Sequence, residues 1–439
     1  MIKTSNILLA FYGDDFTGST DALEFICRAG AKALLFIEPP TPEQLAAYPD
    51  LDVFGVAGVT RSLPPDEMQQ ILLTAFEKIK ATGAGQVHYK VCSTFDSSTA
   101  VGSIGQAIDC GITVFNNKLV PVVGGTPGLG RYCLFGNLFA RMGIGSSGDI
   151  YRLDRHPSMS KHPVTPAVES DLRLHIGQQT DQHIGLINLL QLEQPIQEWT
   201  AHLQDNEKLV LIDALNEAQL YKIGEWMNAQ GNGNEPVFSV GPSSVEMALG
   251  LYWTSIGRLT KRINWTNPGK ASPLLVISGS CSPVTAAQIT FALKNGFEEV
   301  VIDIENIDSN AGMEETIWQV NELLQRKKNV VVHTGEKQQQ NLSAETIGTM
   351  LGNIARAAAE QSLVKRVVIA GGDTSSYAAR AMEIEAVEMI APLVTGAPLC
   401  GAISANKYIQ GLEVNFKGGQ VGCEDYFEVM LNGELGDRK

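Results

Sequence analysis

The chain lacks the patterns that indicate a disulfide framework or a structural metal site. Its seven cysteines form no C-x-x-C pair and are odd in number, which is typical of reduced thiols rather than of paired half-cystines. Its seven histidines form no H-x-x-x-H or H-E-x-x-H pair, so a zinc site has little support. We therefore expect a cytoplasmic protein without a protein-bound structural metal.

Long apolar runs and blocks of like charge are also missing. No run approaches the length of a membrane span, and charged residues are 18% of the chain without forming a tract. The formal net charge of -15 argues against nucleic acids and anionic membranes, because such partners favour Lys/Arg stripes. We expect neither nucleic acid nor membrane as a partner. Any anionic ligand must therefore be bound by basic side chains within its own site.

The 439 residues are too many for one ordinary core, so two domains are expected. Both halves alternate short apolar runs with helical stretches, which predicts an α/β fold in which each domain is a mostly parallel sheet flanked by helices. Glycine and polar residues interrupt this alternation at 254–273. We predict an N-terminal domain over 1–253, a linker over 254–273 and a C-terminal domain over 274–439.

The stretch from Ile7 to Asp21 has the densest set of polar side chains beside a predicted strand. An apolar run ends at Gly13, two carboxylates follow at Asp14 and Asp15, and a helical pattern begins directly afterwards. The turn after a parallel strand is where ligands bind in such sheets. The two carboxylates could instead only cap the helix, but capping needs one such residue and this turn offers several.

Other polar side chains of the first half follow neighbouring predicted strands and should gather at the same sheet edge. Acids beside basic groups suit a small polar anion, with Arg and Lys on its charge and Asp on its hydroxyls. Two of these residues could instead have no role in binding. Arg131 could form a surface ion pair, as arginines commonly do, and His162 could be a solvated loop residue. The candidates are Asp14, Asp15, Arg61, Lys90, Ser93, Asp96, Arg131 and His162.

Three turns of the second half combine small residues with the start of a helix or a cation. Helix N-termini and glycine backbones are suited to phosphate, and three such turns in one domain favour a polyphosphate ligand. Glycine and serine in such connections can also serve only to turn the chain. The turns contain Ser280, Ser282, Gly371, Gly372, Asp373, Thr374, Gly418 and Gly419, with Lys417 beside the last two.

Two familiar glycine patterns are set aside. Gly143–Gly148 matches G-x-G-x-x-G, but residues 137–142 are predicted to be helical and no helix follows, so the dinucleotide-binding context is missing. Gly125–Gly130 has the glycine spacing of a Walker A motif but continues with Arg131, without the required Lys and hydroxyl. We predict a loop at the first and no P-loop at the second.

Taken together, six segments in this order resemble the four-carbon acid sugar kinases over nearly the whole chain. These segments are Gly13–Asp21, Thr60–Ser62, Lys90–Asp96, Val276–Pro283, Gly371–Ser375 and Lys417–Gly419. The resemblance implies an N-terminal sugar-acid domain and a C-terminal nucleotide domain. It also implies phosphorylation of a terminal hydroxyl of threonate, erythronate or 3-oxo-tetronate with ATP, and related members act on acids such as 3-oxo-isoapionate.

Carried over by position, the resemblance puts Asp14 or Asp15, Arg61 and the Lys90–Ser93 turn on the sugar acid. It puts ATP on Ser280 or Ser282, on Gly371–Thr374 and on Gly418 or Gly419. The chain departs from the family at Gly124–Arg131, where only the Arg of a Pro-Glu-Asn-Gly-Arg-like segment is kept, and at Lys417–Gln420, where other members have Lys-Ser-Gly. These departures leave the individual acid open.

We therefore predict an ATP-dependent kinase of carbohydrate metabolism that phosphorylates a sugar acid of tetronate or 3-oxo-tetronate type. Mg²⁺ would bridge the phosphates, the glycine turns would hold them, and Asp14 or Asp15 would orient the attacking hydroxyl. Two alternatives stay open: a non-catalytic sensor of nucleotide and sugar acid, and an aldolase with a Schiff base on Lys90. An aldolase would not need the phosphate turns. The sequence does not decide whether the protein forms a homo-oligomer.

Overall fold

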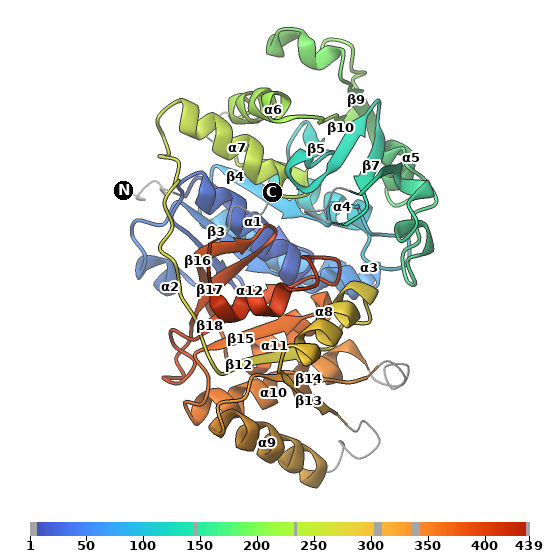
Figure 1. Ribbon diagram of the computed structural model, residues 1–439. Helices are drawn as coiled ribbons and strands as arrows, with labels where there is room; N and C mark the ends of the chain where they lie inside the picture. Colours follow the sequence, from blue (N-terminus) through green and yellow to red (C-terminus); the bar gives the residue numbers. More distant parts are fainter. Residues whose placement is uncertain (1–6, 144–147, 232–234, 303–309, 336–342, 436–439) are drawn as a thin grey trace. The chain divides into compact units, whose positions relative to one another are not determined.

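The computed structural model describes residues 7–143, 148–231, 235–302, 310–335 and 343–435 (Figure 1). The chain divides into two compact units. Unit 1 contains Met1–Ala33 and Pro39–Ile263, and unit 2 contains Leu34–Glu38 and Asn264–Lys439. Each is α/β with a largely parallel sheet, so the predicted fold class is confirmed.

Unit 1 is built on a parallel sheet with strand order β3-β1-β4-β11-β5-β10-β9. Central strands such as β1, β4 and β11 are buried along their whole length, because helices cover both faces. This explains why β1 and β11 are short apolar runs in the sequence rather than an alternation. The strands are β1 (Leu9–Gly13), β3 (Val53–Ala57), β4 (Gln86–Lys90), β5 (Val120–Val123), β9 (His183–Ile187), β10 (Glu207–Ile212) and β11 (Val237–Gly241).

The helices of unit 1 form two packed groups. α3 packs on α4, and α7 packs on both α1 and α6. Between α3, α4 and β11, the rings of Phe76, Phe115 and Phe238 lie with centroids 5.2–5.5 Å apart, which gives this side of the sheet an aromatic core. The helices are α1 (Phe16–Arg28), α2 (Pro42–Ala46), α3 (Pro65–Ala81), α4 (Ile104–Phe115), α5 (Leu172–Gly177), α6 (Glu217–Ala229) and α7 (Ser244–Ser255).

A small antiparallel sheet corrects the helix that we predicted at 137–142. Its strands are β6 (Arg131–Leu134), β7 (Asn137–Arg141) and β8 (Ile150–Arg152). Burial alternates along β7, and Phe135 and Gly136 join β6 to β7 with φ values of 50° and 82°. Positive φ at both turn residues is typical of a tight hairpin, which overrides local helix propensity. Residues 144–147 of the set-aside glycine pattern lie outside the described residues.

Unit 2 has the strand order β13-β14-β12-β15-β18-β17-β16-β2. The first five strands are parallel, whereas β16 and β17 form an antiparallel hairpin. The outer partner of β16 is β2, which comes from the N-terminal part of the chain and pairs Leu34 with Glu388 and Phe36 with Ala386. The strands are β2 (Ala33–Phe36), β12 (Leu274–Ser278), β13 (Glu298–Val301), β14 (Val330–His333), β15 (Arg366–Ala370), β16 (Ala386–Val394), β17 (Ala397–Ile403) and β18 (Glu413–Lys417).

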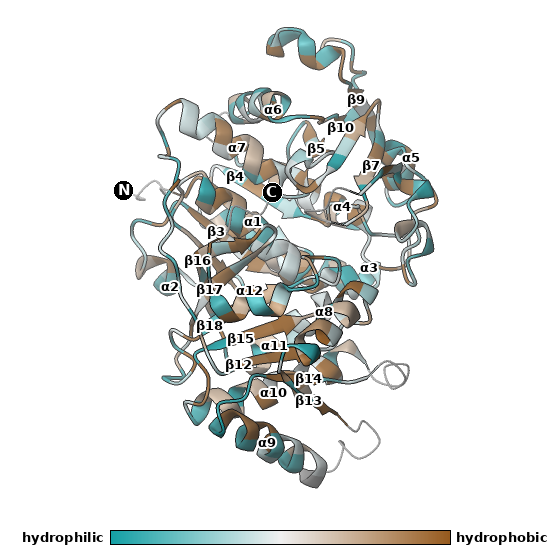
Figure 2. Cartoon of the chain, in the orientation of Figure 1, coloured by the Kyte–Doolittle hydropathy of each residue, from teal (hydrophilic) through white to brown (hydrophobic). Residues whose placement is uncertain are grey.

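Five helices accompany this sheet in the described part of unit 2. Figure 2 shows that its strands β12 and β15 are predominantly hydrophobic, whereas α9 has a mixed surface. A buried ion pair fixes the base of the sheet, because Arg366 Nε donates to Glu413 Oε2 at 2.7 Å. The helices are α8 (Pro283–Lys294), α9 (Asn310–Gln325), α10 (Ala344–Glu360), α11 (Gly372–Ala381) and α12 (Tyr426–Asn432). Across the described residues, none of the helices combines the length and apolarity that a bilayer crossing requires.

Candidate active site

In unit 1, backbone hydrogen bonds tie together the turns that follow β1, β3 and β4. Gly13 and Lys90 are level in the β1–β4 register. The Asp14 N–H donates to the carbonyl oxygen of Lys90 at 2.9 Å, and the Arg61 N–H donates to the carbonyl oxygen of Asp14 at 3.0 Å. The structure therefore brings Asp14, Arg61 and Lys90 to one sheet edge, where the sequence placed them.

A single guanidinium spans the two adjacent carboxylates. Arg61 Nη2 and Nε donate to the two oxygens of Asp14 at 2.7 and 3.1 Å, and Arg61 Nη1 donates to Asp15 Oδ2 at 2.7 Å. Both carboxylates are at most 3% exposed. Burial raises the pKa of Asp14, and Arg61 opposes that rise. Burial lowers the pKa of Arg61, but the two carboxylates outweigh it and raise that pKa well above its usual value.

The capping interpretation holds for one of the two carboxylates. Asp15 is the N-cap of α1: its Oδ1 accepts from the Gly18 N–H at 2.8 Å, and its Oδ2 accepts from the Thr17 hydroxyl at 2.7 Å. The hydrogen bonds described for the Asp14 carboxylate come from Arg61 alone. Asp14 therefore keeps more acceptor capacity than Asp15.

Lys90 is a buried cation whose counter-charge is Asp21. Its Nζ is 3.7 Å from Asp21 Oδ2 and donates to the carbonyl oxygen of Val91 at 2.8 Å. Asp21 also accepts from the Ser243 hydroxyl at 2.8 Å. Burial raises the pKa of Asp21 to about 6, and Lys90 opposes that rise. Asp21 and Ser243 were not among our candidates, although Asp21 lies inside the motif that begins at Gly13.

Gly18 makes the close approach of these groups to α1 feasible. A Cβ at this position would lie 2.6 Å from Asp15 Oδ1 and 3.0 Å from Lys90 Nζ. Distances below 3.0 Å are shorter than van der Waals contact, so any side chain here would displace the Asp15 carboxylate.

Arg131 is buried rather than engaged in the surface ion pair that is common for arginine. It is 6% exposed, and its Nη1 donates to the carbonyl oxygens of Leu129 at 2.7 Å and Arg141 at 3.5 Å. Its Nε has no hydrogen-bond partner within the described residues. Burial lowers the pKa of Arg131, whereas Cys92 and Asp96 oppose that change, so the turn after β4 faces this guanidinium.

His156 is a second buried donor near Arg131, and no sequence pattern had singled it out. Its Nδ1 accepts from the N–H groups of Ser158 and Met159, each at 3.2 Å, so the proton of the neutral ring is on Nε2. That Nε2 makes no well-formed hydrogen bond within the described residues, although the carbonyl group of Arg141 is near enough to favour its proton. Burial and the nearby Arg131 lower the pKa of His156.

The remaining candidates of unit 1 differ in their surroundings. Ser93 is buried and Asp96 half-buried in the turn after β4. His162 follows a short 3₁₀ turn, and its Nδ1 accepts from the Thr165 N–H at 3.1 Å. The contacts described for His162 are local, and none joins it to Arg61 or Lys90.

In unit 2, the three glycine and serine turns follow adjacent strands. Ser278 is level with Ala370, and Ala370 is level with Lys417, so β12, β15 and β18 end together. The Gly279 N–H donates to the carbonyl oxygen of Ala370 at 3.1 Å, and the Gly371 N–H donates to that of Lys417 at 2.9 Å. The predicted phosphate turns therefore form one continuous edge.

These turns approach each other so closely that a side chain on Gly279 or Gly371 would clash and one on Gly419 would be tightly packed. A Cβ on Gly279 would lie 2.4 Å from Thr374 Oγ1, and one on Gly371, where φ is 124°, would lie 2.7 Å from the same oxygen. A Cβ on Gly419 would lie 3.4 Å from Ser280 Oγ and 3.0 Å from the Cβ of Ser282. Gly372 and Asp373 begin α11, and the side chain of Asp373 is outside the described part.

Further polar residues, which we did not predict, support these turns from α8 and β18. Thr285 Oγ1 accepts from Ser280 Oγ at 3.1 Å and from Lys417 Nζ at 2.9 Å. Gln288 Nε2 donates to the carbonyl oxygens of Val421 at 3.0 Å and Cys423 at 2.9 Å, which fixes the loop after Gly418 and Gly419.

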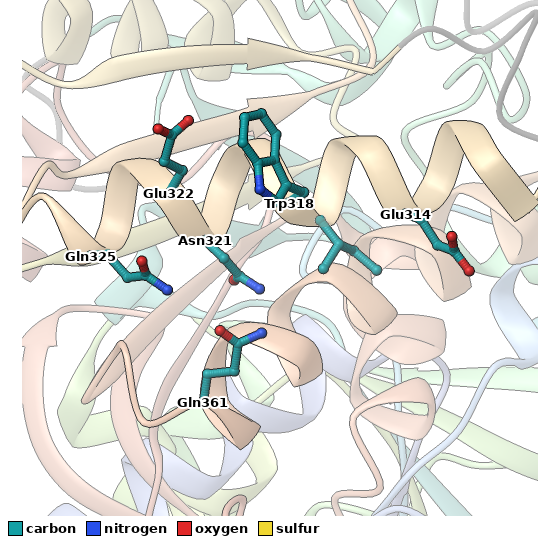
Figure 3. A pocket seen from close by; sticks show the side chains of 7 residues that line it. Glu314, Trp318, Asn321, Glu322, Gln325 and Gln361 are labelled. Carbon is teal, nitrogen blue, oxygen red and sulfur yellow. The ribbon is translucent and has the colours of Figure 1, made fainter.

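A hollow of about 290 Å³ lies along α9 of unit 2 (Figure 3). None of its lining residues belongs to a glycine turn. They are Glu314, Ile317, Trp318, Asn321, Glu322, Gln325 and Gln361.

Comparison with known proteins matches both halves of the chain. The profile of the sugar-binding N-terminal domain matches residues 9–249, and that of the nucleotide-binding C-terminal domain matches residues 275–427. A 3-oxo-isoapionate kinase from Paraburkholderia graminis is 38% identical and aligns with 98% of this chain and 95% of its own length. A 3-oxo-tetronate kinase from Pseudomonas savastanoi pv. phaseolicola is 27% identical and aligns with 98% of both chains.

Solved structures show the same fold. A Salmonella typhimurium LT2 protein superposes with a TM-score of 0.74 at 23% identity, covering 97% of this chain and 98% of that one. A Haemophilus influenzae protein superposes with a TM-score of 0.68, also at 23% identity, covering 96% and 98%.

A sugar-binding domain followed by a nucleotide-binding domain, with kinases among the full-length relatives, defines an ATP-dependent sugar-acid kinase. The chain belongs to the four-carbon acid sugar kinase family. The predicted family and enzyme class are thus confirmed.

Proposed function

We propose that this enzyme transfers the γ-phosphoryl group of ATP to a terminal hydroxyl of a small 3-oxo sugar acid, of the 3-oxo-isoapionate or 3-oxo-tetronate type. The proposal is supported by the relatives that carry these two activities along nearly the whole chain. The observation that carries it is the buried cluster of Asp14, Arg61 and Lys90 at the strand ends of unit 1.

Arg131 is the group that we assign to the carboxylate of the acid. A buried charge without an opposite charge in contact costs several kcal/mol, and a bound carboxylate would remove much of that cost. Arg131 is buried, and its described hydrogen bonds go to uncharged carbonyl groups. Its fork can hold a carboxylate through two parallel hydrogen bonds. Lys90 adds a second positive charge at the same sheet edge, and His156 Nε2 offers a neutral donor for a further substrate oxygen.

Asp14 is our choice for the carboxylate that orients the attacking hydroxyl. Asp15 already accepts from the helix N-terminus, from Thr17 and from Arg61, whereas among the described residues Asp14 accepts from Arg61 only. The raised pKa of Asp14 also makes it a better proton acceptor than an ordinary aspartate. Asp15 and Arg61 would hold Asp14 in place.

The three turns of unit 2 are our candidates for the phosphates of ATP. Their hydroxyls, one lysine and the N-terminus of α11, which no side chain caps, are the kinds of donor that phosphate oxygens require. Mg²⁺ would neutralise developing charge across the β- and γ-phosphates. Within the described residues, no group of three or more His, Cys, Asp or Glu could hold a metal ion by itself. That fits a cation carried mainly by phosphates and water, as Mg²⁺ commonly is.

The test is a panel of 3-oxo and reduced sugar acids with Mg-ATP, with ADP release measured. Asp14→Asn should lower kcat at least ~100-fold, which is typical for the loss of a general base, and should leave ATP affinity unchanged. The matched control is Asp50→Asn, because Asp50 is an exposed aspartate whose partner is Lys32. Full activity of Asp14→Asn would refute its role, and no ADP release with any acid would favour the sensor. Borohydride trapping of a keto acid on Lys90 would favour the aldolase.

A further inference from the structure

Lys417 is a completely buried lysine at the end of β18, directly before the Gly418–Gly419 turn. Its Nζ donates to Thr285 Oγ1 and to the carbonyl oxygen of Gly418, both at 2.9 Å. The ring of Tyr426 lies below it, with the centroid 5.5 Å from Nζ. All three of these neighbours are uncharged.

No carboxylate neutralises Lys417 within the described residues. It forms no ion pair there, unlike Arg366, the other fully buried cation of unit 2, which contacts Glu413. Among the side chains that the structure describes, the titratable one that faces Lys417 is Tyr426 on α12, and its hydroxyl donates to Asn415 Oδ1 at 2.8 Å. From α8 the facing group is the Thr285 hydroxyl, whereas the N–H of Gly371 in the turn after β15 donates to the backbone carbonyl of Lys417 and not to its side chain. Burial alone lowers the pKa of Lys417 to about 7.

We propose that Lys417 is the buried counter-charge of the nucleotide phosphates, and that nucleotide binding draws a proton from solvent onto its Nζ. This inference rests on the proposed function, because it takes the Gly418–Gly419 turn as part of the phosphate site. Phosphate oxygens above that turn favour the ammonium form, which the free protein disfavours. Lys417 is therefore a positioning and charge-balancing residue rather than a catalytic one.

The hydrogen bonds around Thr285 connect Lys417 to the turns. Thr285 Oγ1 accepts from both Lys417 Nζ and Ser280 Oγ, and its own hydrogen points to the carbonyl oxygen of Gly419 at 3.4 Å. The protonation state of Lys417 is thereby linked to Ser280 and Gly419, two of the residues that we assign to phosphate binding.

Isothermal titration with Mg-ADP measures this coupling without turnover. At pH 8 most of the free protein should have neutral Lys417, so binding should take up between roughly half and one proton. Proton uptake is read from the change in observed heat between HEPES and Tris buffers. Lys417→Met should remove the uptake and weaken Mg-ADP binding at least tenfold, and a lysine with a merely structural role would not alter proton uptake.

Lys407→Met is the matched control, because Lys407 is an exposed lysine of unit 2 that also lies over a tyrosine ring, that of Tyr408. It should keep both the affinity and the proton uptake. If Lys417→Met does not fold, Lys417→Arg tests the same point, since arginine keeps its charge at all relevant pH values and should bind without uptake.

The outcomes separate the two proposals. Mg-ADP binding to the wild type without proton uptake, or uptake that persists in Lys417→Met, would overturn the role of Lys417 and leave the proposed function intact. A wild-type protein that does not bind Mg-ADP would overturn both.

Discussion

Replacement of Gly18 by alanine tests how closely the charged groups of unit 1 are packed. Alanine normally stabilises a helix relative to glycine by about 0.5–1 kcal/mol. Here its Cβ would lie 2.6 Å from Asp15 Oδ1 and 3.0 Å from Lys90 Nζ. Overpacking costs about 1–3 kcal/mol, and loss of the Asp15 cap costs about 1 kcal/mol more. The clash should therefore outweigh the gain in propensity.

We expect Gly18→Ala to lower the free energy of unfolding by about 1–3 kcal/mol, which corresponds to a fall in Tm of roughly 2–10 °C. Because Asp15 and Lys90 must move, kcat/KM for the sugar acid should fall at least ~10-fold, as expected for a disturbed charged site. Affinity for Mg-ADP should stay unchanged. Thermal unfolding, ADP release and calorimetry measure the three quantities.

Gly177→Ala is the matched control, because Gly177 is also helical and a Cβ there would meet no atom within 4 Å. It should be neutral or slightly stabilising. A Gly18→Ala enzyme with wild-type Tm and wild-type kcat/KM would show that Asp15 and Lys90 do not need the space that Gly18 leaves.

Two further predictions concern unit 2 and pH. Gly279→Ala should weaken Mg-ADP binding at least ~10-fold, because its Cβ would lie 2.4 Å from Thr374 Oγ1. The control Gly401→Ala should bind Mg-ADP normally, because the atom nearest to its Cβ would be 3.6 Å away. Equal affinities of the two variants would refute the close packing of the turns. Asp21, with a pKa of about 6, binds more protons in the folded than in the unfolded state between about pH 4 and 6. The free energy of unfolding should therefore fall by about 3 kcal/mol as pH rises through this window. Urea denaturation should show a flatter profile in Asp21→Asn, and an unchanged slope would contradict the assignment.

The edges of both sheets could be predicted because buried parallel strands leave a strong sequence signal. Apolar runs that end at Gly13 and Ala370 mark strand ends, and parallel strands bring such ends together. Local patterns could not show that Asp15 caps α1 while Asp14 does not, since both have the same side chain and similar neighbours.

Burial and long-range pairing were beyond the reach of these patterns. The strand at 137–141 was missed because its hairpin partner and the turn at Phe135 decide its conformation. Lys417 was recognised as a cation beside glycines, but its lack of a counter-charge depends on which side chains surround it in space. His156 has no sequence context that separates it from a solvated loop histidine.

The origin of β2 has a consequence for how the chain can be divided. Residues 34–38 complete unit 2 from a position more than two hundred residues ahead of the rest of it. A recombinant fragment that starts at Asn264 would lack this strand and leave the backbone of β16 open to pairing with other molecules. During synthesis, likewise, the segment that completes the second sheet leaves the ribosome long before the strand it must pair with, so this contact cannot form until β16 has emerged.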